Sequence, residues 1–196
     1  MKRLILASES PGRQKILKDA GYEFEVIPGT YEEDMTLPMP PHELAIHLSR
    51  GKAHSVVEMI KANKLDAKPD AIIIAADTFG VYDNHILGKP HTPENALRML
   101  TMLSGRTHSM VTGLTVINIS TGKELNRSVE SKIVFKEISA DEISEYIKLG
   151  ESLKKAGGYM YQGVGRKFVQ SIEGSETNIM GLPIEALGEV LTRAMS

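Results

Sequence analysis

A continuous apolar run over residues 71–76 is the feature of the sequence that most constrains its fold. An uninterrupted run of Ala and Ile predicts a strand that is buried on both faces, as are the central strands of α/β sheets. Asp77 and Thr78 follow the run directly. Because ligands of open α/β sheets bind beyond the carboxyl ends of the strands, we expect the strand to end at Asp77. We also expect the Asp77 carboxylate to be solvated, ionised and able to meet a substrate.

Hydrophobic spacing along the rest of the chain predicts a mixed α/β protein whose sheet has a parallel and an antiparallel part. The predicted strands are 4–7, 24–27, 71–76, a hairpin over 79–87, 108–119, 129–138 and 169–172. The predicted helices are 11–19, 41–60, 93–103, 140–149 and 183–195. The length of 196 residues suits one large domain or two small, closely packed ones, and no linker is evident.

Composition excludes several classes of function. The chain has no Cys, which excludes disulfides, zinc–thiolate sites, iron–sulfur clusters and Cys nucleophiles. A net charge of −2 gives no reason to expect nucleic acid or a membrane as a partner. No apolar run approaches the roughly 18 residues of a membrane span, and the first run stops at Ala7, too short for a signal-peptide core. We therefore expect a cytoplasmic protein.

Three segments carry groups that can hold an anion. The segment 8–13 joins a predicted strand to a helix N-terminus, where free N–H groups favour phosphate, and Ser8 and Arg13 add donors. Lys52 lies on a predicted helix, and Lys89 is held in a loop between Gly88 and Pro90. For the first segment the alternative is an ordinary Ser helix cap, and for each Lys it is a solvated surface charge.

An acidic cluster, Glu32-Glu33-Asp34, lies in a long loop after the second predicted strand. Its carboxylates can hold Mg²⁺ or Mn²⁺ against substrate phosphates, and Asp77 can complete such a site. The alternatives are a solvated acidic loop and an Asp77 that only caps a turn.

Residues 154–163 form a glycine-rich segment with no clear hydrophobic period. Because glycine has no Cβ, the backbone of this segment can approach a ligand closely. The Gln162 amide can read the edge of a nucleobase, although a plain glycine-rich connection is the alternative. Together, the phosphate donors, carboxylates and base-reading loop predict a nucleotide site with a divalent metal.

The chain resembles the Maf-like nucleoside triphosphate pyrophosphatases over nearly its whole length, with the motifs in the same order. The matching motifs are Leu6-Ala7-Ser8-Glu9-Ser10-Pro11-Gly12-Arg13, Glu32-Glu33, Gly51-Lys52-Ala53, Ala76-Asp77-Thr78, Leu87-Gly88-Lys89-Pro90, Ser104-Gly105 with His108 and Val111-Thr112-Gly113, Lys155-Ala156-Gly157-Gly158-Tyr159 with Gln162-Gly163, and Asn178-Ile179-Met180-Gly181-Leu182-Pro183.

This resemblance implies an α/β fold related to inosine triphosphate pyrophosphatases. Such a fold is a single domain over residues 1–196, with a long, highly twisted mixed sheet, flanking helices and two lobes around a central cleft. The implied reaction converts a nucleoside triphosphate to the monophosphate and pyrophosphate with a divalent cation (Mg²⁺, Mn²⁺ or Co²⁺). The family's subgroups prefer dTTP and UTP, which we favour here, or methylated and other modified nucleotides. The family also suggests a homodimer.

The resemblance also implies a role for each matching residue. Asp77 is implied to be the catalytic base and, with Glu33 favoured over Glu32, to hold the metal. Lys89 is implied to be the second catalytic residue, which holds the phosphates and stabilises the leaving pyrophosphate. Ser8, Arg13 and Lys52 are implied to bind the phosphates, and Gln162 to contact the nucleotide.

Three residues depart from the family pattern: Gly12 replaces a usual Arg, Lys154 a usual Asp and Ser152 a common Pro. These departures bear on nucleobase preference more than on the reaction. Three alternatives stay open at this point: an inosine or xanthosine triphosphate pyrophosphatase, a non-catalytic nucleotide-binding regulator of cell division, and a sugar-nucleotide transferase.

Overall fold

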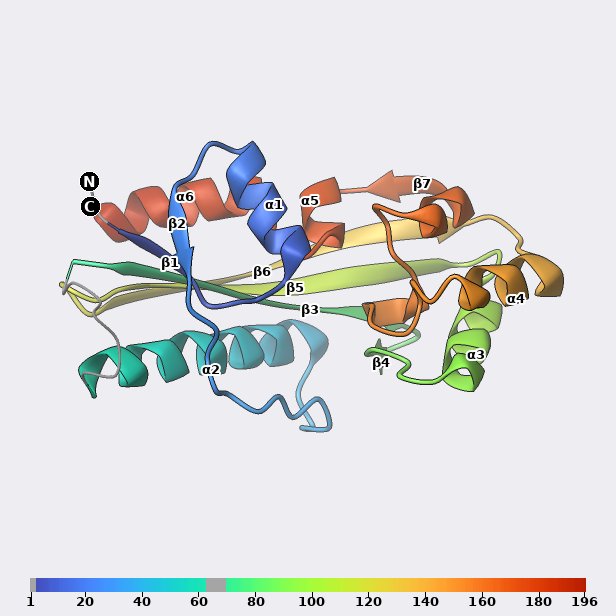
Figure 1. Ribbon diagram of the computed structural model, residues 1–196, viewed down its shortest axis with the longest axis horizontal. Helices are drawn as coiled ribbons and strands as arrows, with labels where there is room; N and C mark the ends of the chain where they lie inside the picture. Colours follow the sequence, from blue (N-terminus) through green and yellow to red (C-terminus); the bar gives the residue numbers. More distant parts are fainter. Residues whose placement is uncertain (1–2, 63–69) are drawn as a thin grey trace. The chain divides into compact units, whose positions relative to one another are not determined.

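Figure 1 shows the computed structural model of the chain, which describes residues 3–62 and 70–196. It contains a mixed seven-stranded sheet with the order β2-β1-β3-β5-β6-β7, in which β4 pairs with β3. β1 pairs with β2 and β3 in parallel, whereas β3–β4 and β6–β7 are antiparallel. The predicted α/β class, with a mixed sheet flanked by helices, is therefore confirmed.

The chain divides into two compact units, and β3, β5 and β6 each contribute residues to both. The first unit comprises Met1–Asp77, Thr112–Val129 and Gly181–Ser196, and the second comprises Thr78–Val111 and Glu130–Met180. The prediction of a single domain with two lobes around a cleft stays a prediction.

The first unit is a sheet covered by helices on both faces. Its elements are β1 (Leu4–Leu6), α1 (Pro11–Asp19), β2 (Phe24–Val26), α2 (Pro41–Lys61), α6 (Ile184–Met195) and parts of β3 (Ile72–Tyr82), β5 (Thr107–Asn118) and β6 (Lys123–Phe135). Figure 1 shows α2 on one face of these strands and α1 and α6 on the other.

The core under α2 follows the periods of a strand and a helix. Buried α2 side chains pack against every second residue of β1 and β3, because alternate residues of a strand share a face. This core comprises Ile5, Ala7, Ala53, Val56, Val57, Ile60, Ala71, Ile73, Ala75 and Ile117. Gly113 of β5 lets the α2 backbone approach closely, since a methyl group there would overlap the carbonyl of Ala45. Residues of α2 are thus held directly against the sheet.

The second unit has an aromatic core. Its elements are the remainders of β3, β5 and β6 with β4 (His85–Leu87), α3 (Pro93–Leu103), α4 (Ala140–Lys148), the 3₁₀ turns η1 (Ala156–Gly158) and η2 (Val164–Phe168), β7 (Val169–Glu173) and α5 (Glu176–Ile179). Ser139 and Glu142 form a capping box that starts α4.

Most predicted elements are present, with three differences. β3 does not end at Asp77 but continues to Tyr82, where Asp83 and Asn84 turn with positive φ into β4, as the predicted hairpin requires. β6 begins at Lys123 rather than at residue 129. The prediction missed its first residues because they are mostly polar and show no apolar alternation. The short elements η1, η2 and α5 fall in segments without a period and were not predicted.

Within the described residues, no helix combines the length and the apolar character that crossing a bilayer requires.

Candidate active site

Asp77 lies in the middle of β3, which corrects the expectation that the strand ends there. What ends nearby is the neighbouring strand. β1 stops at Leu6, whose register partner is Ile74, and Ala7 N donates the last bond of this pair to Ile74 O at 2.8 Å. Asp77 comes three residues after Ile74, so it lies beyond the carboxyl end of β1. The site is therefore at a strand end, as predicted, but the strand that ends is β1.

The Asp77 carboxylate is buried, which corrects the expectation that water keeps it ionised. Its side chain is 6% exposed and forms an ion pair with Lys52 Nζ from α2. The same Nζ lies 2.7 Å from Glu33 Oε1. A buried carboxylate needs a charged partner to offset its lost hydration, and here the ammonium of Lys52 is that partner.

Arg13 extends this group from α1. Its Nη1 donates to Ser8 Oγ at 3.0 Å, and its Nε donates to the carbonyl oxygen of Gly181 at 2.8 Å. Burial lowers the pKa of Arg13, and the negative charges of Asp77 and Glu33 oppose that shift. We call Arg13, Glu33, Lys52 and Asp77 the charged cluster; all four belong to the first unit.

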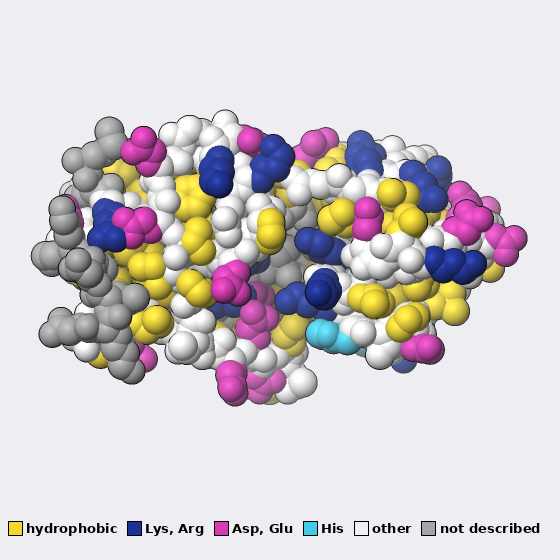
Figure 2. All heavy atoms as spheres, in the orientation of Figure 1, with side chains coloured by type: hydrophobic (Ala, Val, Ile, Leu, Met, Phe, Trp, Pro, Cys, Tyr) yellow, Lys and Arg dark blue, Asp and Glu magenta, His cyan; other side chains and the backbone are white. Residues whose placement is uncertain are grey.

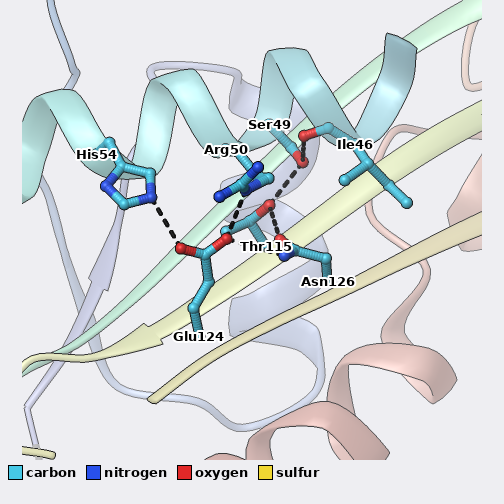
Figure 3. A network of polar contacts seen from close by, with 7 residues as sticks. All are labelled: Ile46, Ser49, Arg50, His54, Thr115, Glu124 and Asn126. Atoms are coloured by element: carbon cyan, nitrogen blue, oxygen red, sulfur yellow. Dashed lines mark hydrogen bonds and ion pairs between the residues drawn. The ribbon is translucent and has the colours of Figure 1, made fainter. Parts of the chain in front are cut away.

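A polar network holds α2 against β5 and β6 (Figure 3). Arg50 Nε and His54 Nε2 bind the two carboxylate oxygens of Glu124 on β6, at 2.5 and 2.8 Å. Residues 50 and 54 share one side of a helix, and residue 52 projects from the opposite side. Burial raises the pKa of Glu124, but bonds from Asn126, Arg50 and His54 outweigh it and hold that pKa at about 2.

The inner part of the same network fixes α2 to β5. Ser49 and Thr115 are fully buried, and their hydroxyl oxygens lie 2.7 Å apart (Figure 3). Thr115 Oγ1 also donates to Asn126 Oδ1 at 2.8 Å. These satisfied buried hydroxyls fix the position of α2 on the sheet, and hence the position of Lys52.

The acidic loop places only one of its carboxylates on Lys52. Glu33 makes that contact, while Asp34 accepts bonds from the amide and hydroxyl of Thr36 at 2.9 and 2.6 Å, which lower its pKa. Glu32 is exposed. Glu33 is thus the carboxylate that reaches Lys52, and its role as a metal ligand stays a prediction.

Two carboxylates of the charged cluster are of the kind that could hold a divalent cation together with substrate phosphates. Among residues 3–62 and 70–196, no three His, Asp or Glu side chains are grouped to hold a metal on their own. Asp77 and Glu33, however, approach the same ammonium, so their oxygens converge. Proteins usually bind Mg²⁺ through one or two carboxylates, and substrate phosphates supply further ligands.

Lys89 and Gln162 belong to the second unit, where both are exposed. The two loops that carry the surrounding motifs lie side by side, because Gly157 N donates to Gly88 O at 3.2 Å. Gln162 Nε2 donates to Met180 Sδ at 3.1 Å. The structure therefore brings these two motifs together, and the roles of Lys89 and Gln162 stay predictions.

Two contributors were missed in the sequence. The carbonyl of Gly181 binds Arg13, but a backbone oxygen leaves no signal in the side-chain pattern. Tyr31 packs against α2 beside Lys52, and an aromatic residue within an otherwise acidic loop is the signal that could have indicated it.

Beyond the end of a parallel strand, the first unit therefore holds two cations, two carboxylates and a strand-to-helix turn, an arrangement typical of α/β proteins that bind nucleotide phosphates. The model of the family described as "Maf-like protein" matches residues 3–194. The chain belongs to this family, so the resemblance inferred from the motifs is confirmed.

Several curated relatives cover nearly the same length. A protein from Alkaliphilus oremlandii is 42% identical over 97% of this chain and 95% of its own. Relatives from Syntrophus aciditrophicus and Bdellovibrio bacteriovorus are 41% and 36% identical over 97% of this chain and 89% and 97% of their own. All three are named dTTP/UTP pyrophosphatase.

Proposed function

We propose that this chain is a nucleoside triphosphate pyrophosphatase that converts dTTP or UTP to the monophosphate and pyrophosphate. The observation that carries the proposal is the charged cluster beyond the end of β1, in which the Asp77 carboxylate pairs with Lys52 and the Arg13 guanidinium is close enough to feel the charge of Asp77. Relatives at 36–42% identity that are named for this activity support it.

The cluster supplies the chemistry of phosphoanhydride hydrolysis. Asp77 accepts a proton from, or orients, the water that attacks the α-phosphorus. Arg13, Lys52 and the amides at the start of α1 stabilise the charge that grows on the leaving pyrophosphate. Lys52 contacts both carboxylates, so binding of a triphosphate would exchange part of this pairing for pairing with phosphate oxygens.

A divalent cation is part of this proposal. Asp77 and Glu33 would hold it together with the triphosphate, and when bound it neutralises charge on the phosphate oxygens. Lys89 and Gln162 are proposed to contact the pyrophosphate and the nucleobase, respectively. A homodimer and a cytoplasmic location also stay predictions.

The surface drawn in Figure 2 bears on the choice of partner. On that face Lys and Arg side chains lie among Asp and Glu side chains rather than in one cationic band. A continuous cationic surface is what binding to a nucleic-acid backbone requires, and the face drawn in Figure 2 does not present one.

The deciding experiment assays the purified chain against a panel of triphosphates with Mg²⁺, Mn²⁺ and Co²⁺. Phosphate is measured with and without added inorganic pyrophosphatase, which separates pyrophosphate release from orthophosphate release. We expect pyrophosphate from dTTP and UTP, with less from ITP, XTP and the purine triphosphates. Preference for ITP or XTP, or nucleotide binding without any turnover, would contradict the proposal.

A further inference from the structure

The acidic loop rests on α2 through two glycines. Gly29 lies against the helix so closely that a methyl group there would overlap Ser55 Oγ and come within 2.9 Å of the carbonyl oxygen of Lys52. Gly51 lies directly under the ring of Tyr31, and a methyl group on Gly51 would meet Tyr31 Cε1 at 2.6 Å. Both contacts flank Lys52 and exist only because each glycine lacks a Cβ.

A helix interior gives no local reason for glycine at position 51, because Gly there is less favourable than Ala. Gly51 has a helical φ, unlike the glycines with positive φ in the turns. The space that it leaves is filled by the Tyr31 ring. The position therefore exchanges helix propensity for a contact with the loop.

This contact lies two residues from Glu33 in the chain and one residue from Lys52. Glu33 Oε1 is 2.7 Å from Lys52 Nζ, so the segment that carries both Tyr31 and Glu33 meets α2 at Gly51 and again at Lys52.

We propose that Tyr31, seated on Gly51, is a positioning residue that holds Glu33 in the charged cluster. This inference rests on the proposed function, because Glu33 matters to turnover only if the cluster binds the triphosphate and its cation. The ring, not the hydroxyl, makes the contact with Gly51. Tyr31→Phe should therefore leave the position of Glu33 unchanged, whereas Gly51→Ala should displace Glu33 from the charged cluster.

Gly51→Ala is the primary test. The ring is the mobile end of a side chain, so it would move and leave the helix intact, while helix propensity raises the melting temperature. We expect kcat/KM for dTTP to fall about 10- to 100-fold, as for a misplaced catalytic group, mostly through kcat because Lys52 and Arg13 still bind phosphate.

Gly188→Ala is the matched control. Gly188 lies within α6, and the nearest atom to a Cβ there is Tyr22 Oη at 4.0 Å. This variant makes the same chemical change within a helix without an overlap. We expect a raised melting temperature and wild-type kcat/KM.

Two further variants separate the ring from the helix. Tyr31→Phe should have near wild-type kcat/KM, and Tyr31→Ala should lose about as much as Gly51→Ala. Combining Gly51→Ala with Tyr31→Ala should cost no more than either change alone, because both remove one contact. Additive losses would show that the Gly51→Ala change acts through the helix and would overturn the proposal.

A measurement that does not need turnover completes the test. A glutamyl endopeptidase cleaves after Glu32 and Glu33, and mass spectrometry identifies those cuts. We expect Gly51→Ala and Tyr31→Ala, but not Gly188→Ala or Tyr31→Phe, to be cut several-fold faster there. Wild-type cleavage or wild-type turnover in Gly51→Ala overturns the inference, whereas an inactive wild-type protein overturns the proposed function instead.

Discussion

In the first unit Lys52 pairs with the carboxylates of Asp77 and Glu33, whereas in the second unit His108 lies among aromatic rings. The second group, which we call the aromatic cluster, comprises His108, Phe135, Tyr159 and Phe168. Both groups bury polar atoms. The first group keeps its charges and matches them in pairs, and the second is built from uncharged rings.

The physical reason for the difference is what surrounds each polar group. His108 is 2% exposed, its Nε2 lies 2.9 Å from Tyr159 Oη, and its Nδ1 has no partner within the described part of the chain. Burial lowers the pKa of His108 to about 4, so its ring is neutral near pH 7. Burial likewise raises the pKa of Tyr159.

The two clusters differ in whether their polar groups can change partners. Paired charges at a partly exposed edge can exchange partners with a phosphate, because Glu33 is 36% and Lys52 14% exposed. Neutral rings packed edge to face have nothing to exchange and contribute to the stability of the core. Damage to the charged cluster should therefore reduce activity first, and damage to the aromatic cluster should reduce stability first.

The largest expected effect is that of Asp77→Asn, which keeps the shape of the side chain and removes its basicity. We expect kcat/KM to fall about 10²- to 10⁴-fold, the range of general base catalysis. The melting temperature should change little, since Lys52 retains Glu33 at 2.7 Å. Pyrophosphate release at the wild-type rate would contradict the role given to Asp77.

Phe135→Ala should have the opposite effect to Asp77→Asn: a loss of stability with little loss of activity. Phe135 is 1% exposed, and its ring centroid lies 4.7 Å from that of His108 and 4.8 Å from that of Tyr159. Truncating a buried Phe costs about 3–5 kcal/mol of unfolding free energy. Urea denaturation measures this loss, while kcat per folded molecule should stay close to that of the wild type. A large loss of kcat at full stability would break the division between the two clusters.

Acid should weaken the aromatic cluster in a defined pH window. The folded protein holds the pKa of His108 at about 4, against an ordinary value of 6.5, so the unfolded chain binds the proton first as the pH falls. Unfolding free energy should then decrease by about 3 kcal/mol between pH 6.5 and pH 4, and be constant in this respect above pH 6.5.

His108→Phe provides the control for that pH dependence, because Phe does not titrate. The variant loses the bond to Tyr159 at every pH, but its stability should change less between pH 6.5 and pH 4 than that of the wild type. Parallel curves for the two proteins would rule out His108 as the source.

The smallest effect is expected for Glu124→Gln, which removes the charge that binds Arg50 and His54. Both partners are 48% exposed, so solvent screens the pairs and the loss should be about 1 kcal/mol. Because the pKa of Glu124 is held at about 2, this contribution is present above pH 4.5 and disappears as the pH falls toward 2. Differential scanning calorimetry at pH 7 and pH 3 should show the difference between variant and wild type shrink.

Several features of the charged cluster were predictable from residue type and order. The apolar run before Asp77 predicted a buried strand, and the structure has β3 there, although it continues past Asp77. The Ser8–Arg13 segment was expected to join a strand to a helix start, and it does join β1 to α1. The hairpin at Asp83 and Asn84 followed from turn residues that accept positive φ. These signals are local, so the sequence carries them directly.

Other features could not be predicted. The sequence pattern ended the strand at Asp77, but β3 continues, because its hydrogen-bonding partners decide its length and residues 80–82 pair with β4. Glu33 and Asp77 were expected to share a metal site and Lys52 to bind phosphate, but no pattern in the sequence predicts that Lys52 pairs directly with both carboxylates or that Gly181 receives the Arg13 guanidinium. These contacts join residues that are far apart in the sequence.

The sequence by itself determined the alternation of strands and helices, the order of the motifs and the family to which the chain belongs. It did so because hydrophobic period and turn chemistry act over a few residues. Only the tertiary structure decided that Lys52 neutralises a buried Asp77, that Glu33 rather than Glu32 joins them, and that His108 is buried in a neutral form. Ion pairing and burial depend on which segments the packed sheet brings together, and no local pattern records that.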